Sequence, residues 1–267
     1  MSKVVLVTGA SSGIGKSIAT FLSKKGFTVY GTSRNPKNIE SFSFQLIALD
    51  VLNTATINSA VDLIIEKEGR LDVLVNNAGM GITGPVEDTP TDEMRAVFNT
   101  NLFGAIDVMK AVLPQMRKQN SGTIINVTSI AGYMGLPFRA AYSASKGALE
   151  LVTEATSMEV KNFGINVVNV APGDFATNIA AGRYHTPVFD NSAYKEKYQA
   201  SLDLMDAHVD HGMDPIEMAK TVYKIINNKN PKIHYKVGDF MQKFSIVLKR
   251  ILPDKMYQKL LMNHYKL

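Results

Sequence analysis

Short apolar runs alternate along the chain with longer segments in which apolar residues recur every three or four positions. The runs are rich in β-branched residues and lie at 4–7, 28–31, 46–49, 72–75, 123–127 and 165–170. Their apolar residues largely follow one another directly, which is typical of parallel strands covered by helices on both faces. The intervening segments predict helices at 13–25, 54–68, 92–119 and 143–163. This alternation predicts an α/β fold on a doubly wound parallel sheet of the Rossmann type, with about seven strands.

The alternation stops after the sixth run. Residues 174–214 show no strand pattern and only weak helical periodicity, and a segment of that length is typically functional. We therefore expect it to form a helical lid over a substrate site. Beyond it, the pattern predicts a helix at 216–227 and a last strand at 232–237. The tail, about residues 238–267, predicts two basic amphipathic helices separated at Pro253.

Composition narrows the class of protein. With 267 residues, of which 45% are apolar and 20% charged, the chain can bury one full core, so we expect a single domain over residues 1–267. The chain has no cysteine, which excludes disulfides and thiolate metal sites. The first apolar run is too short for a signal peptide or a membrane span, and we expect a cytoplasmic protein.

The net charge of +5 comes from the tail. Residues 236–267 carry 7 of the 29 basic and 2 of the 24 acidic residues, which leaves the rest of the chain balanced. A basic tail could face nucleic acid or acidic lipid, but a solvated helix face also explains it, and we expect no nucleic-acid partner. The apolar residues of the tail predict packing over the substrate cleft or on a second subunit. Weak contact with a membrane surface is the alternative.

A glycine-rich turn follows the first predicted strand. It reads Thr8-Gly9-Ala10-Ser11-Ser12-Gly13-Ile14-Gly15 and leads directly into a predicted helix. The glycines let the backbone turn tightly and approach a pyrophosphate, whose charge then faces the free N–H groups of the helix N-terminus. The residues expected to bind a dinucleotide here are Gly9, Ser11, Ser12, Gly13, Ile14 and Gly15.

The end of the second predicted strand indicates which dinucleotide is bound. NAD-binding folds place an acidic residue there, against the ribose 2′-hydroxyl. This chain has Thr32-Ser33-Arg34 instead. The Arg34 guanidinium offers a fork of donors that suits a 2′-phosphate, and Ser33 or Ser11 can add a hydroxyl donor, so we expect NADP(H).

Four further residues follow in a characteristic order. Tyr142 and Lys146, in Tyr142-Ser143-Ala144-Ser145-Lys146, lie one turn apart on one face of a predicted helix. Ser129 follows the fifth predicted strand, and Asn101 lies in the helical segment at 92–119. Together with the glycine turn, these residues resemble the short-chain dehydrogenase/reductase family in its shorter, single-domain branch. The resemblance is dense over about residues 3–177.

The resemblance assigns roles to these four residues. It implies that Tyr142 is the general acid or base, that Lys146 supports it and holds the nicotinamide ribose, and that Ser129 binds the substrate oxygen. Asn101 is expected to hold a water molecule that links Lys146 to solvent. Carbonyl reduction places negative charge on oxygen and needs a positioned proton donor. A free phenol has a pKa near 10, and lowering it by about 3 units takes roughly 4 kcal/mol, part of which a nearby ammonium supplies.

The same resemblance extends the cofactor site to the ends of three other predicted strands. Asp50 and Val51 are expected at the adenine ring. The residues expected along the rest of the cofactor are Asn77, Ala78 and Gly79 after the fourth strand, and Pro172, Gly173 and Thr177 after the sixth. An acid at Asp174 departs from the commoner forms of this last loop and leaves its substrate side open.

The expected substrate is a lipophilic ketone or aldehyde with its alcohol, steroid-like or retinoid-like in character. The uncharged residues predicted to line the cleft are Met80, Ile130, Met134, Leu136, Phe138 and Phe175. A 3-oxoacyl thioester or a general carbonyl compound is an alternative substrate. A non-catalytic NADP-sensing protein is another reading, but it would not need Ser129, Tyr142 and Lys146 together.

A metal site and the oligomeric state are the remaining questions. His208 and His211, beside Asp206 and Asp210, have a spacing that suits a metal, but the chemistry implied by the resemblance needs none, and we expect no metal. The resemblance implies a homodimer or homotetramer, paired through the helix that begins near Tyr142 and the segment at 92–119.

Overall fold

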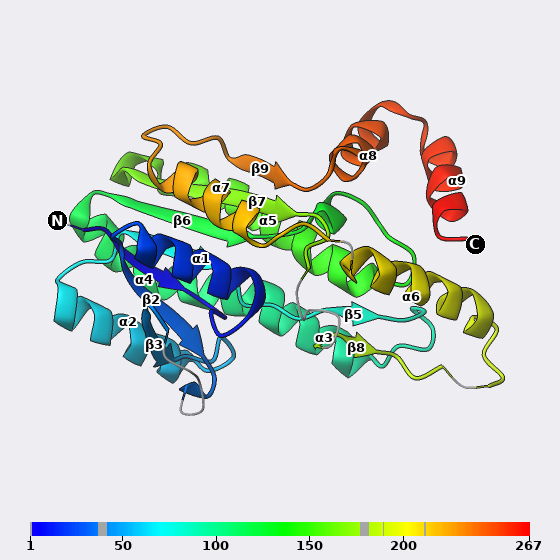
Figure 1. Cartoon of the computed structure of the whole chain (residues 1–267), viewed down its shortest axis with the longest axis horizontal. Helices are drawn as coiled ribbons and strands as arrows, with labels where there is room; N and C mark the ends of the chain where they lie inside the picture. Colours follow the sequence, from blue (N-terminus) through cyan, green and yellow to red (C-terminus); the bar gives the residue numbers. More distant parts are fainter. Residues whose placement is uncertain (1, 37–41, 177–181, 189, 211) are drawn as a thin grey trace.

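Seven parallel strands form the central sheet, in the order β3-β2-β1-β4-β6-β7-β9 (Figure 1). The structure, a computed structural model, describes residues 2–36, 42–176, 182–188, 190–210 and 212–267, with 206–210 as backbone. The strands are β1 (Val4–Val7), β2 (Thr28–Ser33), β3 (Gln45–Ala48), β4 (Val73–Asn76), β6 (Gly122–Val127), β7 (Ile165–Pro172) and β9 (His234–Val237). The predicted Rossmann-type sheet, with its seventh strand near 232–237, is confirmed.

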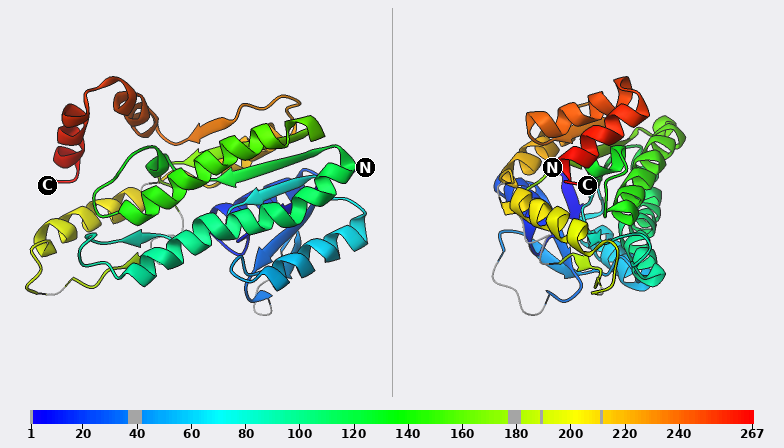
Figure 2. Two further views of the ribbon diagram at one scale, coloured as in Figure 1. Left: turned by 180° about the vertical axis from the view of Figure 1, so that it is seen from behind. Right: turned by 90° about the vertical axis from the view of Figure 1, so that its right-hand side faces the viewer.

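Helices cover both faces of this sheet, which explains the continuous apolar runs. Val5 and Val7 share one core with α1 (Gly13–Lys24) and α7 (Ile216–Ile226). Val4 and Leu6 share the opposite core with α2 (Thr54–Glu68) and α4 (Ala105–Gln119). Seen from behind, α4 and the long α5 (Ala140–Glu159) run side by side over that second face (Figure 2, left). Successive residues of a strand point to opposite faces, so each face needs its own apolar set.

The helical segment expected at 92–119 has three parts. It comprises α3 (Thr91–Phe98), a π-helical stretch η2 (Asn99–Gly104) and α4. A single π-helical stretch is too short to produce an apolar period of its own, so the sequence pattern did not reveal it. The run Thr91–Gln119 is also long and apolar enough to cross a membrane. Val97, Val108 and Val112 are fully buried in the protein, however, so this run is a core helix.

Residues after β7 form the lid region, where the sequence showed no strand pattern. The strand β8 (Tyr184–His185) pairs in parallel with β5 (Ile82–Thr83) in a second, two-stranded sheet. A two-residue strand is too short to produce a period, which is why the sequence missed it. The helical part is α6 (Lys195–Asp210), which lies beyond the carboxyl ends of the main strands (Figure 1).

The tail forms two helices at the same end of the molecule as the lid. These are α8 (Phe240–Ile251) and α9 (Asp254–His264), which meet at Pro253 as predicted. Ile246 and Tyr257 are buried and pack with Ile130 and Met134 of the loop that follows β6. One side of the tail therefore belongs to the structure around the carboxyl ends of the strands.

Candidate active site

The glycine turn lies at the carboxyl end of β1, where the strand order reverses between β1 and β4. Such a switch point is where open α/β sheets bind their ligands. Gly9 and Gly13 have φ values of +65° and +53°, a region that favours glycine. Gly15 leaves no room for a side chain, because a Cβ there would lie 2.3 Å from the Gly9 carbonyl oxygen. The turn therefore needs glycine at each of the three predicted positions.

Asn77, which follows β4, holds this turn in place. Its side-chain amide donates to the carbonyl oxygens of Thr8, at 2.9 Å, and Gly9, at 3.1 Å. In return, the Thr8 hydroxyl accepts hydrogen bonds from the backbone N–H groups of Asn77 and Ala78. The turns after the two central strands thus form one hydrogen-bonded unit, so Asn77 stabilises the cofactor loop as well as flanking it.

The N-terminus of α1 fits a diphosphate. Its N-cap residue, Ser12, is exposed and makes no side-chain capping hydrogen bond, and its first turn contains no acidic residue. The first N–H groups of a helix are therefore available to an anion, and the helix dipole adds partial positive charge there. Together with the glycine turn, this arrangement fits a dinucleotide, which Ser11, Ile14 and Gly13 would contact through the backbone.

The ends of β2 and β3 lie beside this turn. Arg34 is exposed and makes no hydrogen bond or ion pair with any described residue, so its guanidinium is free to meet a phosphate. The Ser33 hydroxyl accepts a hydrogen bond from the N–H group of Asn35. Asp50 accepts one from the N–H group of Leu52, and Val51 packs against Gly104 of η2. All of them lie at the carboxyl edge of the sheet, as the sequence predicted.

Asn101 sits in the π-helical stretch, and its amide makes three hydrogen bonds. Its side-chain oxygen accepts from the N–H group of Met80 at 2.9 Å, while its nitrogen donates to the Met80 carbonyl oxygen and the Ser145 hydroxyl. The π-helical turn therefore directs Asn101 at the segment after β4 and at α5. Gly79 lies against Asn101 and Lys146 together, because a Cβ on Gly79 would be 3.0 Å from Asn101 Oδ1 and 3.4 Å from Lys146 Nζ. The expected neighbours thus meet at Gly79.

Lys146 is buried beneath the site, and its Nζ donates to the carbonyl oxygen of Val127 at 2.9 Å. Burial lowers the pKa of Lys146, because the charged form loses its water, while the adjacent Tyr142 opposes that shift. Tyr142 and Lys146 are both buried and lie one turn apart on α5, so the structure keeps the predicted pair together.

Two glycines place Ser129 beside this pair. Ser129 caps a short 3-10 helix, η3 (Ile130–Tyr133), by accepting a hydrogen bond from the N–H group of Ala131 at 3.1 Å. Gly132 of η3 packs on the backbone of α5, where its Cβ would be 3.1 Å from the N–H nitrogen of Gly147. Since the Ser129 oxygen already accepts from Ala131, its own O–H is free to donate to a substrate oxygen.

The loop after β7 is held by the tail. The Gln242 side-chain oxygen, from α8, accepts from the N–H group of Asp174, and its nitrogen donates to the Asp174 carboxylate at 2.7 Å. Gly173 is tightly enclosed by Gln242, since a Cβ on Gly173 would lie 1.9 Å from Gln242 Oε1. Pro172 ends β7 at this point, and Thr177 lies outside the described residues. The predicted nicotinamide loop is therefore fastened by a residue that the sequence did not single out.

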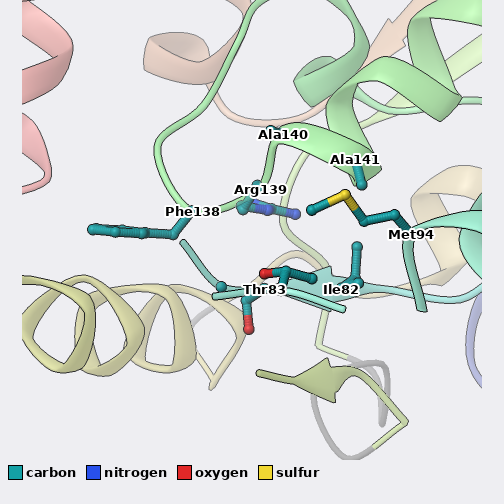
Figure 3. Close-up of a pocket in the computed structure, with 9 residues that line it drawn as sticks. Ile82, Thr83, Met94, Phe138, Arg139, Ala140 and Ala141 are labelled. Carbon is teal, nitrogen blue, oxygen red and sulfur yellow. The ribbon is translucent and has the colours of Figure 1, made fainter. Parts of the chain in front are cut away.

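Arg139 lies beside the site and was also not predicted from the sequence. Its guanidinium carbon lies 5.0 Å from the ring centroid of Tyr142. Burial raises the pKa of Tyr265, near the C-terminus, and the neighbouring Arg139 and a hydrogen bond from it oppose that shift. Figure 3 shows the small pocket beside these residues, where Arg139 and the Met94 side chain point toward each other above Ile82. Arg139 thus joins the Tyr142 ring to the last turn of the chain.

The lid and the predicted cleft wall meet around Phe138. Its ring stacks edge-on against Tyr198 of α6 at 5.3 Å, and the Tyr198 hydroxyl bonds to the Thr83 side chain at 3.0 Å. Met80 and Leu136 pack in the apolar cluster that contains Tyr142. Ile130 and Met134 pack beneath the tail instead, and Phe175 lies in the core between the sheet, α1 and α7.

The described residues that could hold a metal ion are not the ones considered from the sequence. The side chains of Asp206, His208, Asp210 and His211 lie outside the described residues. Among the described residues, Glu150, Glu154 and His234 bring potential ligand atoms within 4.8 Å of one another. The two imidazole nitrogens of His234 each face one carboxylate, Glu150 at 3.2 Å and Glu154 at 3.1 Å, so this group lies where α5 meets β9.

Comparisons with known proteins agree with this geometry. The family model for short chain dehydrogenases matches residues 3–187. A 3-ketodihydrosphingosine reductase of Bacteroides thetaiotaomicron is 42% identical over 258 residues, which cover 96% of this chain and 95% of that protein. A short-chain dehydrogenase of Streptomyces avermitilis has a similar structure, with a TM-score of 0.84, 31% identity, and coverage of 100% of this chain and 97% of that one. The structure of ElxO with NADP bound gives a TM-score of 0.72 at 29% identity, and the match covers 89% of this chain and 96% of that one.

Proposed function

The chain belongs to the short-chain dehydrogenase/reductase family, and from that premise we propose that it reduces a long-chain ketone of the 3-ketodihydrosphingosine type with NADPH. It is an NADP-dependent oxidoreductase acting on CH–OH and C=O groups. The observation that supports this reaction is the meeting of Asn101 and buried Lys146 at Gly79, with Tyr142 one helical turn from Lys146 on α5. A non-catalytic nucleotide sensor would not need this arrangement.

Each residue has a defined task in the reaction. When bound, NADPH supplies the hydride that is added to the carbonyl carbon. Tyr142 donates its phenolic proton to the carbonyl oxygen as that oxygen gains negative charge, and the Ser129 hydroxyl donates a hydrogen bond to the same oxygen. The Lys146 ammonium stabilises the phenolate that Tyr142 becomes, and protons from solvent restore the phenol. The sum is ketone, NADPH and a proton giving alcohol and NADP+.

The cofactor would be held by the parts of the site that leave space for it. The glycine turn and the N-terminus of α1 would take the diphosphate, Arg34 the 2′-phosphate, and Lys146 the ribose on the nicotinamide side. Asn101 positions the segment after β4 through its two hydrogen bonds to Met80. The first two assignments rest on the free donors described above and on the fit of the backbone, and the Lys146 assignment is what the family resemblance implies.

The substrate class is supported by the relative named above and by the residues beside Tyr142. Met80, Leu136 and Ile82 supply an apolar surface there. Asp174 supplies a carboxylate at the tail side, held by Gln242 and lying near Tyr265. A ketone with a long alkyl chain and a neighbouring ammonium group would match one apolar and one acidic side. A steroid, a retinoid or a 3-oxoacyl thioester lacks the ammonium group.

One experiment tests both the proposed mechanism and the proposed substrate class. NADPH oxidation is followed with 3-ketodihydrosphingosine, the same ketone without its amine, a steroid ketone, retinal and a 3-oxoacyl thioester, using wild type, Tyr142→Phe and Asp174→Asn. We expect the amino ketone to give the highest kcat/KM and Asp174→Asn to remove the preference for the amine. Tyr142→Phe should lower turnover by at least about 1,000-fold while NADPH affinity changes by less than about threefold. Turnover retained by Tyr142→Phe would refute the mechanism, and a higher rate with another class would refute only the substrate.

We also propose that two copies pair through α4 and α5, as the family resemblance implied. Three large apolar side chains are exposed on this side of the molecule: Phe103, Leu151 and Met158. Exposed apolar residues of this size are commonly covered by a partner. Pairing here would leave the lid and the tail free on each subunit.

A further inference from the structure

The tail helices have two apolar sides, of which only one is used within the described structure. On α8, Ile246 faces the core with Met134 and Tyr257. The opposite side carries an exposed stripe one residue wide, spaced at i, i+4, i+7 and i+11: Phe240, Phe244, Val247 and Ile251. The rings of Phe240 and Phe244 stack at 5.6 Å, which keeps the stripe continuous. On α9, Met256 and Leu260 extend the exposed apolar surface at i, i+4.

Basic residues run alongside this stripe. Lys243 and Arg250 lie on α8, seven residues apart and next to the stripe on one side of the helix, because positions 3 or 7 apart share a face. Lys255 and Lys259 repeat the arrangement beside Met256 and Leu260. All four cations are exposed and form no ion pair with a described residue. By contrast, Lys249 is paired with Asp254 at 3.0 Å and does not contribute free charge.

We propose that this surface, formed by Phe240, Lys243, Phe244, Val247, Arg250, Ile251, Lys255, Met256, Lys259 and Leu260, docks the enzyme on a bilayer that contains anionic lipid. A stripe of aromatic and aliphatic side chains bordered by Lys and Arg is what an interfacial helix presents to acyl chains and acidic headgroups. In a symmetric pair formed through this surface, the basic residues of one copy would face the same basic residues of the other, and their like charges would repel. Charge complementarity therefore favours lipid over self-association here.

The surface is rigidly connected to the catalytic loops. Gln242, on the inner side of α8, is bonded to Asp174, and Ile246 packs against Ile130, next to Ser129. The lid helix is attached as well, because the Ser201 hydroxyl donates to the carbonyl oxygen of Tyr265 at 3.0 Å. A bilayer bound at α8 and α9 would thus lie beside the lid helix and the loops that follow β6 and β7. Docking goes beyond the proposed reaction and does not depend on it.

Vesicle flotation tests the docking without turnover. The vesicles contain phosphatidylethanolamine with phosphatidylglycerol at about 3:1, or phosphatidylcholine alone as the neutral case. We expect the wild-type protein to float with the anionic vesicles and to be released by salt, because surface charges are screened. Lys243→Gln combined with Arg250→Gln should weaken this binding by about tenfold or more. Both side chains are exposed and form no ion pair with a described residue, so these changes should leave folding and catalysis of a water-soluble ketone intact.

A matched pair of double variants separates the tail from other apolar surface. Phe240→Glu with Ile251→Glu changes side chains that are 72% and 66% exposed, and Leu52→Glu with Val86→Glu changes side chains that are 58% and 64% exposed outside both the tail and the proposed α4–α5 interface. Only the tail variant should lose flotation. Wild-type protein that stays unbound, or binds neutral vesicles equally well, would overturn the proposal. So would a tail variant that still floats but changes its mass in solution, because the stripe would then be a subunit interface.

Discussion

Replacing Gly15 with alanine would place a methyl group where two segments of the cofactor site touch. The added Cβ would lie 2.3 Å from the Gly9 carbonyl oxygen and 2.4 Å from Asn77 Nδ2. Ordinary contacts are longer by about 1 Å, so the turn must move by roughly that amount. Gly9 cannot yield easily, because it has a φ of +65° and is itself packed against Ala78.

The cost can be worked out from these contacts. Overpacking of a tight site costs about 1–3 kcal/mol, and the loss of the two hydrogen bonds that Asn77 donates adds about 1 kcal/mol each. The higher helix propensity of alanine offsets up to about 1 kcal/mol of this destabilisation. The net loss is about 3 kcal/mol, which lowers the melting temperature of a chain of this size by about 6–12 °C. Because the diphosphate must approach the displaced turn, NADPH affinity should fall by about 100-fold.

Thermal melting and NADPH titration by fluorescence measure both effects. Gly135→Ala is the control, because no atom lies within 4 Å of its added Cβ. It should change stability by less than about 0.5 kcal/mol and leave NADPH affinity unchanged. If Gly15→Ala melted within about 2 °C of the wild type and bound NADPH within about threefold, the interlocked turn would not limit the site.

Two other perturbations test separate parts of the structure. Arg34→Ala should weaken NADPH binding by about 10- to 100-fold, because charge-assisted hydrogen bonds to the 2′-phosphate are lost, and should leave NADH binding nearly unchanged. Arg95→Ala, which changes an exposed arginine on α3, is the control. An unchanged ratio of NADPH to NADH affinity in Arg34→Ala would contradict the assignment. Burial raises the pKa of Glu150 above its usual 4.5, so the unfolded chain releases this proton first and the free energy of unfolding falls as pH rises from 4.5 to the raised value. Glu150→Gln should remove that fall. The free energy of unfolding is measured by denaturation at several pH values, and the same pH dependence in the variant and the wild type would disprove the role of Glu150.

The sequence alone was enough for the sheet, the glycine turn and the Tyr142–Lys146 pair. Each is written in residues close together along the chain. A run of β-branched residues predicts a buried strand by itself, and Tyr142 and Lys146 share a helix face because they are four residues apart. The turn after β1 needs glycine because of its own backbone angles, so Gly9 and Gly13 could be identified without knowing their neighbours.

Contacts between distant segments could not be predicted in this way. Gly132 and Gly147 are both required by the close approach of η3 to α5, which follows from the packing of two elements. Arg139 gains its place because the chain end returns to bring Tyr265 beside it. The π-helical turn at Asn101 is too short to be recognised from apolar periodicity, yet it decides where that amide points.

The tail shows the division most clearly. The sequence determined that α8 would be amphipathic and basic, with apolar residues on more than one side. Only the tertiary structure decided that Ile246 is buried while Phe240 and Ile251 stay exposed. The physical reason is that periodicity fixes which residues share a face, whereas burial of a face depends on what packs against it.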